Sequence, residues 1–379
     1  DRHSARRRRA AAGRGRPAGV RKANVYYYFK TKSALLEERK DATMGELVLV
    51  TGGTGYLAAW CIATLLRRGY RVRTTVRDAG KADRVRSAIT RAGAPADGLE
   101  FAVADLLGDD GWPDAMAGCS GVLHVASPLT ATRDAEAVIR PAVDGTLRVL
   151  RAARDAGVRR VVYTSSCGAV YYGHPDRPTP FDESDWTIIG GGPMSAYVTS
   201  KALAERAAWD FLAAEGGDLQ LTVVNPAGIF GPALSPEATS SLGLIRTLLG
   251  GTPGVPNLWM GIVDVRDVAE LHVLALESPE AAGERFIAWG AGPVSMPQIA
   301  ALLRERLGTD AARVPRRTLP DWLVRLAGRF DTEIGDLVPL LGQRRTATSA
   351  KARRLLGWTP RPWQDTIEES ARCLVAYQS

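Results

Sequence analysis

The amino-acid sequence predicts an α/β fold, a doubly wound parallel sheet with a smaller C-terminal lobe. With 379 residues, 45% of them hydrophobic and 24% charged, the chain can bury a full core. From Met44 onward, short apolar runs alternate with helical patterns, which is typical of a parallel sheet covered by helices on both faces. A glycine cluster directly follows the first apolar run, Leu47–Val50, and opens the first helical pattern.

This glycine cluster matches two forms of a dinucleotide-binding fingerprint. Gly53, Gly55 and Ala58 fit G-x-G-x-x-G/A, and Gly52, Gly55 and Ala58 fit T-G-x-x-G-x-x-A. A buried strand precedes the glycines and a helix over residues 56–67 follows them, as the fingerprint requires. The alternative is a purely structural glycine turn. We expect a Rossmann-type pyrophosphate site whose residues include Gly52, Thr54, Gly55, Tyr56 and Leu57.

The end of the second predicted strand, Arg71–Val76, indicates which dinucleotide is bound. A carboxylate at this position accepts a hydrogen bond from the ribose of NAD, whereas an arginine accommodates the 2′-phosphate of NADP. Arg77 occupies the position, with Lys81 and Arg84 close behind. We therefore expect NADP(H), with NAD(H) as second choice because Asp78 offers a competing carboxylate. Solvated surface charges are the alternative interpretation.

Two more predicted strands end in residues suited to a cofactor cleft. The strand Leu99–Val103 is followed by Asp105, whose carboxylate could accept a hydrogen bond from the adenine amine. The competing interpretation is that Asp105 caps a helix beginning near Asp109. A fourth strand over residues 121–126 runs into Ser127, where small residues would let the chain pass close under the cofactor.

The best candidates for catalysis follow the fifth predicted strand. Ser166 lies at the carboxyl end of Arg160–Ser165, where open α/β sheets bind their ligands. A long helix over residues 195–214 then carries Tyr197 and Lys201. Their separation by four residues places the phenol and the ammonium on one helix face, one turn apart.

This pairing has a chemical reason. The pKa of a free tyrosine is about 10, so proton transfer near pH 7 needs about 4 kcal/mol of extra stabilisation of the phenolate. A neighbouring ammonium and the positive ring of an oxidised nicotinamide both act in that direction. A surface tyrosine beside a solvated lysine is the alternative interpretation.

Several motifs in order resemble the extended short-chain dehydrogenase/reductase family, part of the NAD-dependent epimerase/dehydratase superfamily. The resemblance is strongest to its branch of dihydroflavonol, cinnamoyl-CoA and microbial aldehyde or ketone reductases, and it runs through nearly all of residues 44–379. It is carried by Thr51-Gly-Gly-Thr-Gly-Tyr-Leu-Ala58, Thr75-Val-Arg-Asp78, Ala104-Asp-Leu106, Gly118-Cys-Ser-Gly-Val-Leu-His-Val-Ala-Ser-Pro128, Val162-Tyr-Thr-Ser-Ser166, Tyr197-Val-Thr-Ser-Lys201, Asn225-Pro-Ala-Gly-Ile-Phe-Gly-Pro232 and Val263-Asp-Val-Arg-Asp-Val-Ala269.

The resemblance implies a role for each candidate. Tyr197 is the implied general acid, Ser166 donates a hydrogen bond to the carbonyl oxygen, and Lys201 binds the nicotinamide ribose and lowers the tyrosine pKa. The implied cofactor contacts are Arg77 and Arg84 at the 2′-phosphate, Asp105 and Leu106 at the adenine, Val125, Ala126 and Ser127 along the cleft wall, Pro226 and Ile229 over the nicotinamide, and Ser241 at a phosphate.

This sequence departs from the family pattern at two positions, which limits how far the residue roles of the family apply here. Many relatives carry an asparagine, in an N-x-x-G pattern, that supports a proton-relay water, but here Ala142 stands three residues before Gly145. A relay in this chain therefore needs another group. Plant dihydroflavonol reductases have an asparagine five residues after the catalytic serine, where this chain has Tyr171, which argues against a flavonoid substrate.

We expect two parts within residues 44–379. The cofactor domain should lie mainly in residues 44–230, and the substrate-binding lobe should be built mainly from residues 172–193, 231–260 and 292–362. Trp186, Trp259 and Tyr171 are candidates for the lining of an apolar pocket, although core packing explains each of them equally well.

Residues 1–43 form a basic leader. They hold 13 Lys and Arg against 4 Asp and Glu, so the net charge of +8 comes from this segment. Its first part is rich in arginine and predicts disorder. Residues 18–36 resemble the recognition helix of TetR-type helix-turn-helix repressors, but the supporting helices are missing, so DNA binding is not expected. We interpret the leader as a gene-fusion remnant or an overextended start site.

Composition excludes several other classes. No apolar stretch is long enough to cross a membrane, and no signal peptide is indicated. The four cysteines are scattered, which is typical of reduced thiols in a cytoplasmic protein. Neither the cysteines nor His124, His174 and His272 show metal-ligand spacing, so no metal is expected. No helix face indicates an interface, and both a monomer and a homodimer fit the resemblance.

The leading functional hypothesis is an NADPH-dependent reductase of a small-molecule aldehyde or ketone, with Ser166, Tyr197 and Lys201 as the catalytic set. A second hypothesis is a nucleotide-sugar epimerase or dehydratase with tightly bound NAD, because Val170-Tyr171-Tyr172-Gly173 resembles the V-Y-G of sugar-modifying relatives. A third and remote hypothesis is a DNA-binding regulator that senses NADP.

Overall fold

The computed structural model describes residues 45–128, 132, 134–236 and 241–377. Residues Gly45–Ser379 form one compact unit. The expectations for the basic leader, including its disorder and its TetR-like segment, lie outside the described residues.

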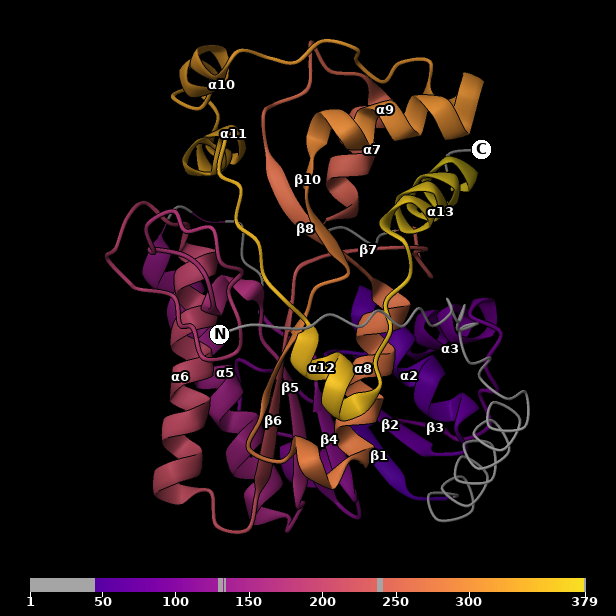
Figure 1. The fold of residues 1–379 in the computed structure, drawn as a ribbon. Coiled ribbons are helices and arrows are strands. Elements are labelled where there is room, and N and C mark those ends of the chain that lie inside the picture. Colours follow the sequence, from indigo (N-terminus) through magenta and orange to yellow (C-terminus); the bar gives the residue numbers. More distant parts are fainter. Residues whose placement is uncertain (1–44, 129–131, 133, 237–240, 378–379) are drawn as a thin grey trace, which may run out of the picture. The chain divides into compact units, whose positions relative to one another are not determined.

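A parallel seven-stranded sheet forms the larger part of this unit (Figure 1). Its strand order is β3-β2-β1-β4-β5-β6-β9, so the order reverses between β1 and β4, as it does in doubly wound folds. The predicted fold class is therefore confirmed. The strands are β1 Leu47–Val50, β2 Arg71–Val76, β3 Leu99–Val103, β4 Gly121–His124, β5 Arg160–Thr164, β6 Gln220–Pro226 and β9 Arg285–Ala288.

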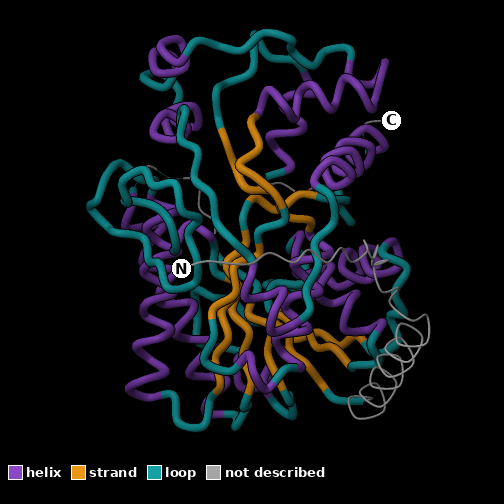
Figure 2. The backbone as a smooth tube through the Cα atoms, in the orientation of Figure 1, coloured by secondary structure: helices purple, strands orange, loops and turns teal. Residues whose placement is uncertain are grey.

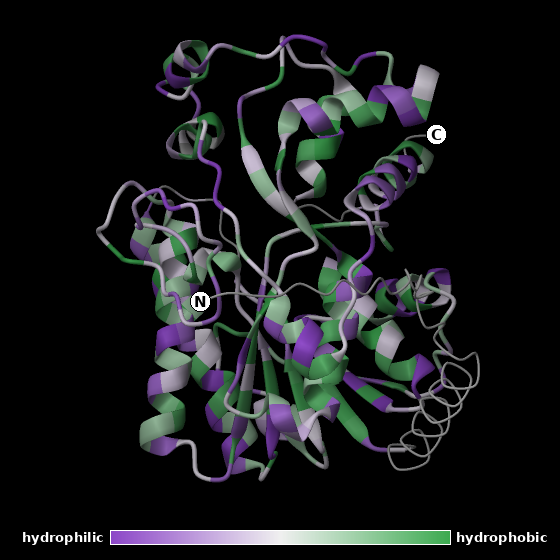
Figure 3. Ribbon diagram, viewed as in Figure 1, coloured by the Kyte–Doolittle hydropathy of each residue, from purple (hydrophilic) through white to green (hydrophobic). Residues whose placement is uncertain are grey.

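Helices cover both faces of this sheet because its central strands are apolar on both sides. Val48 and Val50 belong to the core beneath α2 and α8, whereas Leu47 and Leu49 belong to the core beneath α5 and α6. Colouring by hydropathy shows apolar residues along these strands (Figure 3). The helices packed around this sheet are α2 Tyr56–Arg67, α3 Ala82–Arg91, α4 Trp112–Met116, α5 Ala135–Asp155, α6 Ala196–Glu215, α8 Val265–Glu277 and α12 Ala350–Leu356.

A smaller lobe has its own three-stranded sheet, in the order β10-β8-β7, and its own apolar core (Figure 2). Its strands are β7 Gly228–Phe230, β8 Trp259–Asp264 and β10 Ala291–Ser295. Its helices are α7 Leu242–Gly250, α9 Met296–Leu307, α10 Asp321–Ala327, α11 Thr332–Leu337 and α13 Trp363–Ala376. The described chain as a whole also contains short 3₁₀ helices, which are η1 Ala79–Lys81, η2 Cys167–Ala169, η3 Pro279–Ala281, η4 Gly308–Ala311 and η5 Val338–Leu340.

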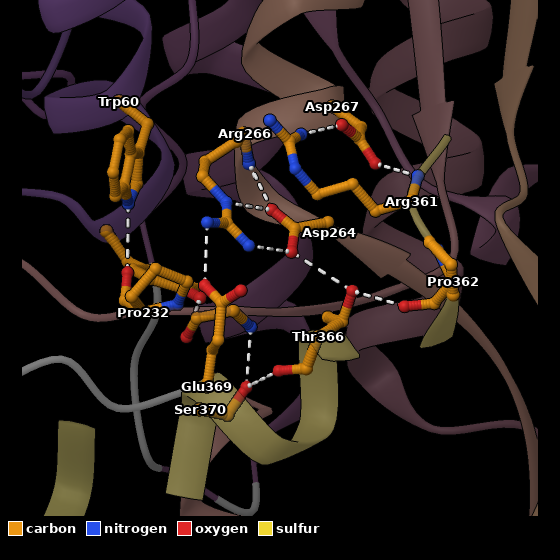
Figure 4. Close-up of polar contacts among 12 residues, drawn as sticks. Trp60, Pro232, Asp264, Arg266, Asp267, Arg361, Pro362, Thr366, Glu369 and Ser370 are labelled. Carbon is orange, nitrogen blue, oxygen red and sulfur yellow. Dashed lines mark hydrogen bonds and ion pairs between the residues drawn. The ribbon is translucent and has the colours of Figure 1, made fainter. Parts of the chain in front are cut away.

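Charged residues at the start of α8 connect this helix to the C-terminal segment (Figure 4). The buried Asp264 carboxylate accepts hydrogen bonds from the backbone and side chain of Arg266 and from Thr366 Oγ1 on α13. One residue after Arg266, the Asp267 carboxylate accepts from the Arg361 backbone N–H at 2.6 Å and also pairs with its guanidinium. These contacts tie the end of β8 to the last helix of the chain.

Two predicted boundaries differ from the observed ones by more than one residue. The fourth strand ends at His124 rather than at residue 126, because the N–H groups of Val125 and Ala126 donate to Thr51 Oγ1. The helix expected near Asp109 begins at Trp112 instead.

Gly53 illustrates why the loop after β1 needs glycine. A Cβ atom at Gly53 would lie 2.4 Å from Thr74 Oγ1, and this hydroxyl donates to the Val50 carbonyl oxygen. We expect Gly53→Ala to lower the free energy of unfolding by about 1–3 kcal/mol, the usual range for overpacking. Urea unfolding would measure it.

Gly243→Ala is the matched control, because Gly243 lies in α7 and a Cβ atom there would meet nothing within 4 Å. This change should raise the free energy of unfolding by up to about 1 kcal/mol through helix propensity. Equal effects of the two substitutions would contradict the packing argument.

Candidate active site

A cleft of about 850 Å³ opens at the carboxyl ends of the parallel strands, around the point where the strand order reverses. Of the residues predicted for catalysis or cofactor binding, only Arg84 does not line it. The residues that do are Gly52, Thr54, Gly55, Tyr56, Leu57, Arg77, Asp105, Leu106, Val125, Ala126, Ser127, Ser166, Tyr197, Lys201, Pro226, Ile229 and Ser241.

The glycine loop has the geometry of an anion site. Gly52 has a φ of +73°, and a Cβ atom there would lie 2.9 Å from Ala126 Cβ. Gly55 precedes α2, and neither a side-chain cap nor an acidic residue occupies the first turn of that helix. The backbone N–H groups at this terminus therefore suit a pyrophosphate, so the residues present fit a dinucleotide.

The basic residues after β2 divide between two hollows. Arg77 is exposed and lines the cleft together with Lys81. Arg84, in contrast, lies in a small adjoining hollow beside Thr54 and donates to Ser235 Oγ at 3.2 Å. The competing carboxylate of Asp78 does not line the cleft, because it accepts the Gly80 N–H at the start of η1.

Asp105 lies in the cleft and does not cap a helix. Its carboxylate accepts the Leu107 N–H at 3.1 Å, within the turn after β3. The residue before α4 is Gly111, which has a φ of +80° and no side chain to act as a cap. The interpretation of Asp105 as a helix cap is therefore wrong.

The structure brings Ser166, Tyr197 and Lys201 together. Ser166 Oγ accepts the Gly168 N–H at 2.9 Å, and its side chain lies near enough to the Tyr197 phenol to lower the pKa of Tyr197. Tyr197 lies in the first turn of α6, where the Ser195 hydroxyl caps the helix. With 41% of its surface exposed, Tyr197 faces the cleft, whereas Lys201 one turn later is buried.

Burial controls the two pKa values that matter here. Burial of the phenol hydroxyl raises the pKa of Tyr197, and the nearby Ser166 side chain lowers it in part. Burial lowers the pKa of Lys201 to about 8, against the raising effect of Glu205. Lys201 Nζ donates to the Thr164 carbonyl oxygen at 3.5 Å, and the lowering of the tyrosine pKa by Lys201 stays a prediction.

A fully buried carboxylate, Glu205, supports this site and was not predicted. It accepts hydrogen bonds from Ser165 Oγ and from Asn225 Nδ2, and the same Nδ2 donates to the Ser166 carbonyl oxygen at 3.1 Å. Arg285 on β9 forms an ion pair with it at 2.6 Å. Its position four residues after Lys201, on the same helix face, was the available sequence signal.

His124, His174 and His272 each form a hydrogen bond with a neighbouring group of the protein. Thr51 Oγ1 accepts two backbone N–H groups, so its proton is donated to His124 Nδ1 at 3.0 Å. Burial lowers the pKa of His124 to about 3 and that of His272 to about 4. His174 bonds to the Trp186 carbonyl oxygen. The described residues contain no cluster of His, Cys, Asp and Glu suited to a metal ion.

The cleft is uncharged beyond Tyr197. Its lining there consists of Tyr171, Tyr172, Met194, Met260, Pro339 and Leu340. Two of the three predicted aromatic residues lie elsewhere: the Trp186 ring packs under Arg285, with 3.7 Å from Cζ to the ring centre, and Trp259 packs under Arg344. Tyr171 does line the cleft.

A family model, the NAD dependent epimerase/dehydratase family, matches residues 48–288. The chain belongs to this family. It is 37% identical to the cinnamoyl-CoA reductase CAD2 of Medicago truncatula over 254 residues, which cover 65% of this chain and 77% of the relative. It is 35% identical to the dihydroflavonol 4-reductase of Zea mays over 283 residues, or 72% and 77% of the two chains.

Among solved structures, the yeast methylglyoxal/isovaleraldehyde reductase Gre2 complexed with NADPH superposes with a TM-score of 0.73. The two chains share 27% sequence identity, and the match covers 88% of this chain and 99% of the yeast chain. These comparisons confirm the predicted family and class: the chain is an NAD(P)-dependent oxidoreductase. None of the described helices is both long and apolar enough to cross a membrane.

The Glu205 ion pair generates a stability prediction. Glu205→Gln would leave Arg285 buried without its carboxylate, so we expect the free energy of unfolding to fall by about 3–5 kcal/mol. Urea unfolding of the full chain would measure this change.

Glu215→Gln on the same helix is the control. Glu215 pairs with Arg154 at the surface, at 3.2 Å and with half of its side chain exposed, so its loss should cost no more than about 1 kcal/mol. A loss below about 1 kcal/mol for Glu205→Gln as well would show that the buried pair does not hold the site together.

Proposed function

We propose that this chain is an NADPH-dependent reductase that converts the carbonyl group of a small aldehyde or ketone into an alcohol. The proposal rests on one observation: Ser166, Tyr197 and Lys201 line the same cleft as the glycine loop. The reductase names of the relatives from Medicago and Zea mays, and the NADPH complex of the yeast structure, support the same activity.

We assign the cofactor contacts as follows. The N–H groups at the start of α2 hold the pyrophosphate, and Arg77 with Lys81 binds the 2′-phosphate that distinguishes NADPH from NADH. Arg84 lies in the adjoining hollow, which Thr54 and Gly55 of the glycine loop also line. A change in the conformation of the Arg84 side chain would bring its guanidinium to the same 2′-phosphate. When bound, the dinucleotide supplies the hydride.

The chain's own residues then handle the proton. Tyr197 Oη faces the cleft, where it would donate its proton to the carbonyl oxygen as negative charge develops there. Ser166 Oγ, near the Tyr197 phenol, would donate a second hydrogen bond to the same oxygen. The Lys201 ammonium would stabilise the phenolate that remains, because it lies one helical turn away in a buried position.

The lining beyond Tyr197 favours an apolar substrate body. Tyr171, Tyr172, Met194, Met260 and Leu340 offer aromatic and flexible apolar surface. A nucleotide sugar would bring a diphosphate and several hydroxyls into this part of the cleft, so we rank the epimerase or dehydratase hypothesis second. Release of NAD from the denatured protein, without net consumption of NADPH, would favour that hypothesis instead.

Removing the proton donor tests the assigned acid. Tyr197→Phe should lower kcat at least a hundredfold, because general acid catalysis contributes about 10²–10⁴-fold. The affinity for NADPH, measured by quenching of protein fluorescence, should change little. Retention of more than about a tenth of the wild-type rate would overturn the assignment.

Removing a cation tests the cofactor preference. A hydrogen bond to a charged group contributes about 1.5–3 kcal/mol, so Arg77→Gln should weaken NADPH binding by roughly 10–100-fold and leave NADH binding nearly unchanged. Calorimetric titration with each cofactor would measure both. Arg140→Gln, at an exposed position on α5, is the control and should alter neither affinity. Equal loss for NADPH and NADH would remove Arg77 from the 2′-phosphate site.

A further inference from the structure

Two adjacent arginines stack on aromatic rings near the substrate end of the cleft. Arg345 Cζ lies 4.6 Å from the centre of the Tyr172 ring and 5.9 Å from that of Tyr171. Arg344 Cζ lies 4.0 Å from the centre of the Trp259 ring. Tyr171 and Tyr172 both line the cleft, so Arg345 contacts the cleft wall, although it is not itself a lining residue.

The chain on either side holds Arg345 in this place. Before it, Leu340 lines the cleft itself. After it, residues 346–348 pair with Phe181: the Phe181 N–H donates to the Thr346 carbonyl oxygen at 2.8 Å, and the Thr348 N–H donates to the Phe181 carbonyl oxygen at 2.9 Å. Figure 1 shows this segment running from α11 to α12, past the loop before α6.

Arg345 has no carboxylate partner among the described residues. Arg177 and Arg285 do have one, in Asp185 and Glu205, whereas the adjacent Arg344 has none among the described residues. The residues that line the substrate end of the cleft carry no charge of either sign. A half-buried cation therefore lies next to this region without a carboxylate partner among the described residues.

The Arg345 guanidinium makes no hydrogen bond to another described residue, so its N–H groups are available to a ligand. A guanidinium lying over an aromatic face keeps its N–H groups in its own plane, and this planar fork matches the two oxygens of a carboxylate. Tyr172 is a neighbour of Arg345 and lines the same cleft as Tyr197: its ring centre lies 4.6 Å from Arg345 Cζ. A substrate with a single aromatic ring is therefore the first probe of this end of the cleft.

We propose that Arg345 binds a carboxylate at the far end of the substrate, so that the enzyme prefers a carbonyl compound that carries an anionic group opposite its reactive carbon. This inference rests on the proposed reductase activity. The apolar body of such a substrate would lie along Tyr171, Tyr172 and Leu340, with its carbonyl at Tyr197 and its carboxylate at Arg345.

The test compares 4-formylbenzoate with its methyl ester, which has the same ring and aldehyde but no charge. The full chain with NADPH should show at least a tenfold higher kcat/KM for the carboxylate. Arg345→Gln should remove this preference by lowering kcat/KM for 4-formylbenzoate about tenfold or more, while the value for the ester changes less than about twofold. Arg345→Lys should fall between the two, because an ammonium keeps the charge but lacks the planar fork.

Two comparisons locate the site and the anion. Arg344→Gln, at the neighbouring arginine, should change the preference less than about threefold; an equal loss there would assign the effect to general positive potential and overturn the proposal. With 4-formylphenyl phosphate as a third substrate, a higher kcat/KM than for 4-formylbenzoate would overturn the choice of a carboxylate over a phosphate.

Binding provides a measurement that does not depend on turnover. Calorimetry should detect 4-(hydroxymethyl)benzoate binding to the wild-type protein and at least tenfold weaker binding to Arg345→Gln, whereas 4-methylbenzyl alcohol should bind both equally. Equal binding of the anion to both proteins would overturn the inference. Binding that depends on Arg345 in a protein that reduces none of the aldehydes would overturn the reductase proposal while leaving the carboxylate site in place.

Discussion

The buried carboxylate of Glu205 is the interaction on which the arrangement of the active site depends. It lies on the same helix as Tyr197 and Lys201 and binds side chains from β6 and β9 and from the residue that follows β5. Because Asn225 also holds the backbone of Ser166, the serine loop and the tyrosine helix share one anchor. A charge in this position is tolerated only because three donors satisfy it.

The second organising feature of the cleft is its distribution of charge. Arg77 and Lys81 stand at the end where a 2′-phosphate would lie, and the glycine loop offers only backbone N–H groups. The opposite end is apolar, and Arg345 contacts its aromatic wall. In the proposed function, such a cleft binds a polyanionic cofactor at one end and a largely apolar substrate at the other, and Tyr197 acts where the two meet.

The sequence was sufficient for the parts of the site that are local in the chain. The glycine fingerprint and the spacing of Tyr197 and Lys201 each depend on one strand end or one helix face, so both could be predicted from local sequence, and the structure places them in one cleft. Contacts between distant segments were not visible: Glu205 and Arg285 lie 80 residues apart, and Arg345 meets Tyr172 only in the folded chain. Trp186 was a reasonable pocket residue by type, yet its ring packs against Arg285 instead.

The central claim, hydride transfer to an external carbonyl, is tested most directly by isotope labelling. The full chain would be given NADPH with deuterium at C4 of the nicotinamide, in the transferred position, together with 4-formylbenzoate, and the alcohol product would be analysed by mass spectrometry. The account predicts one deuterium on the carbinol carbon and one NADPH consumed for each alcohol formed. An unlabelled product, or no consumption of NADPH with NAD recovered from the denatured protein, would contradict it.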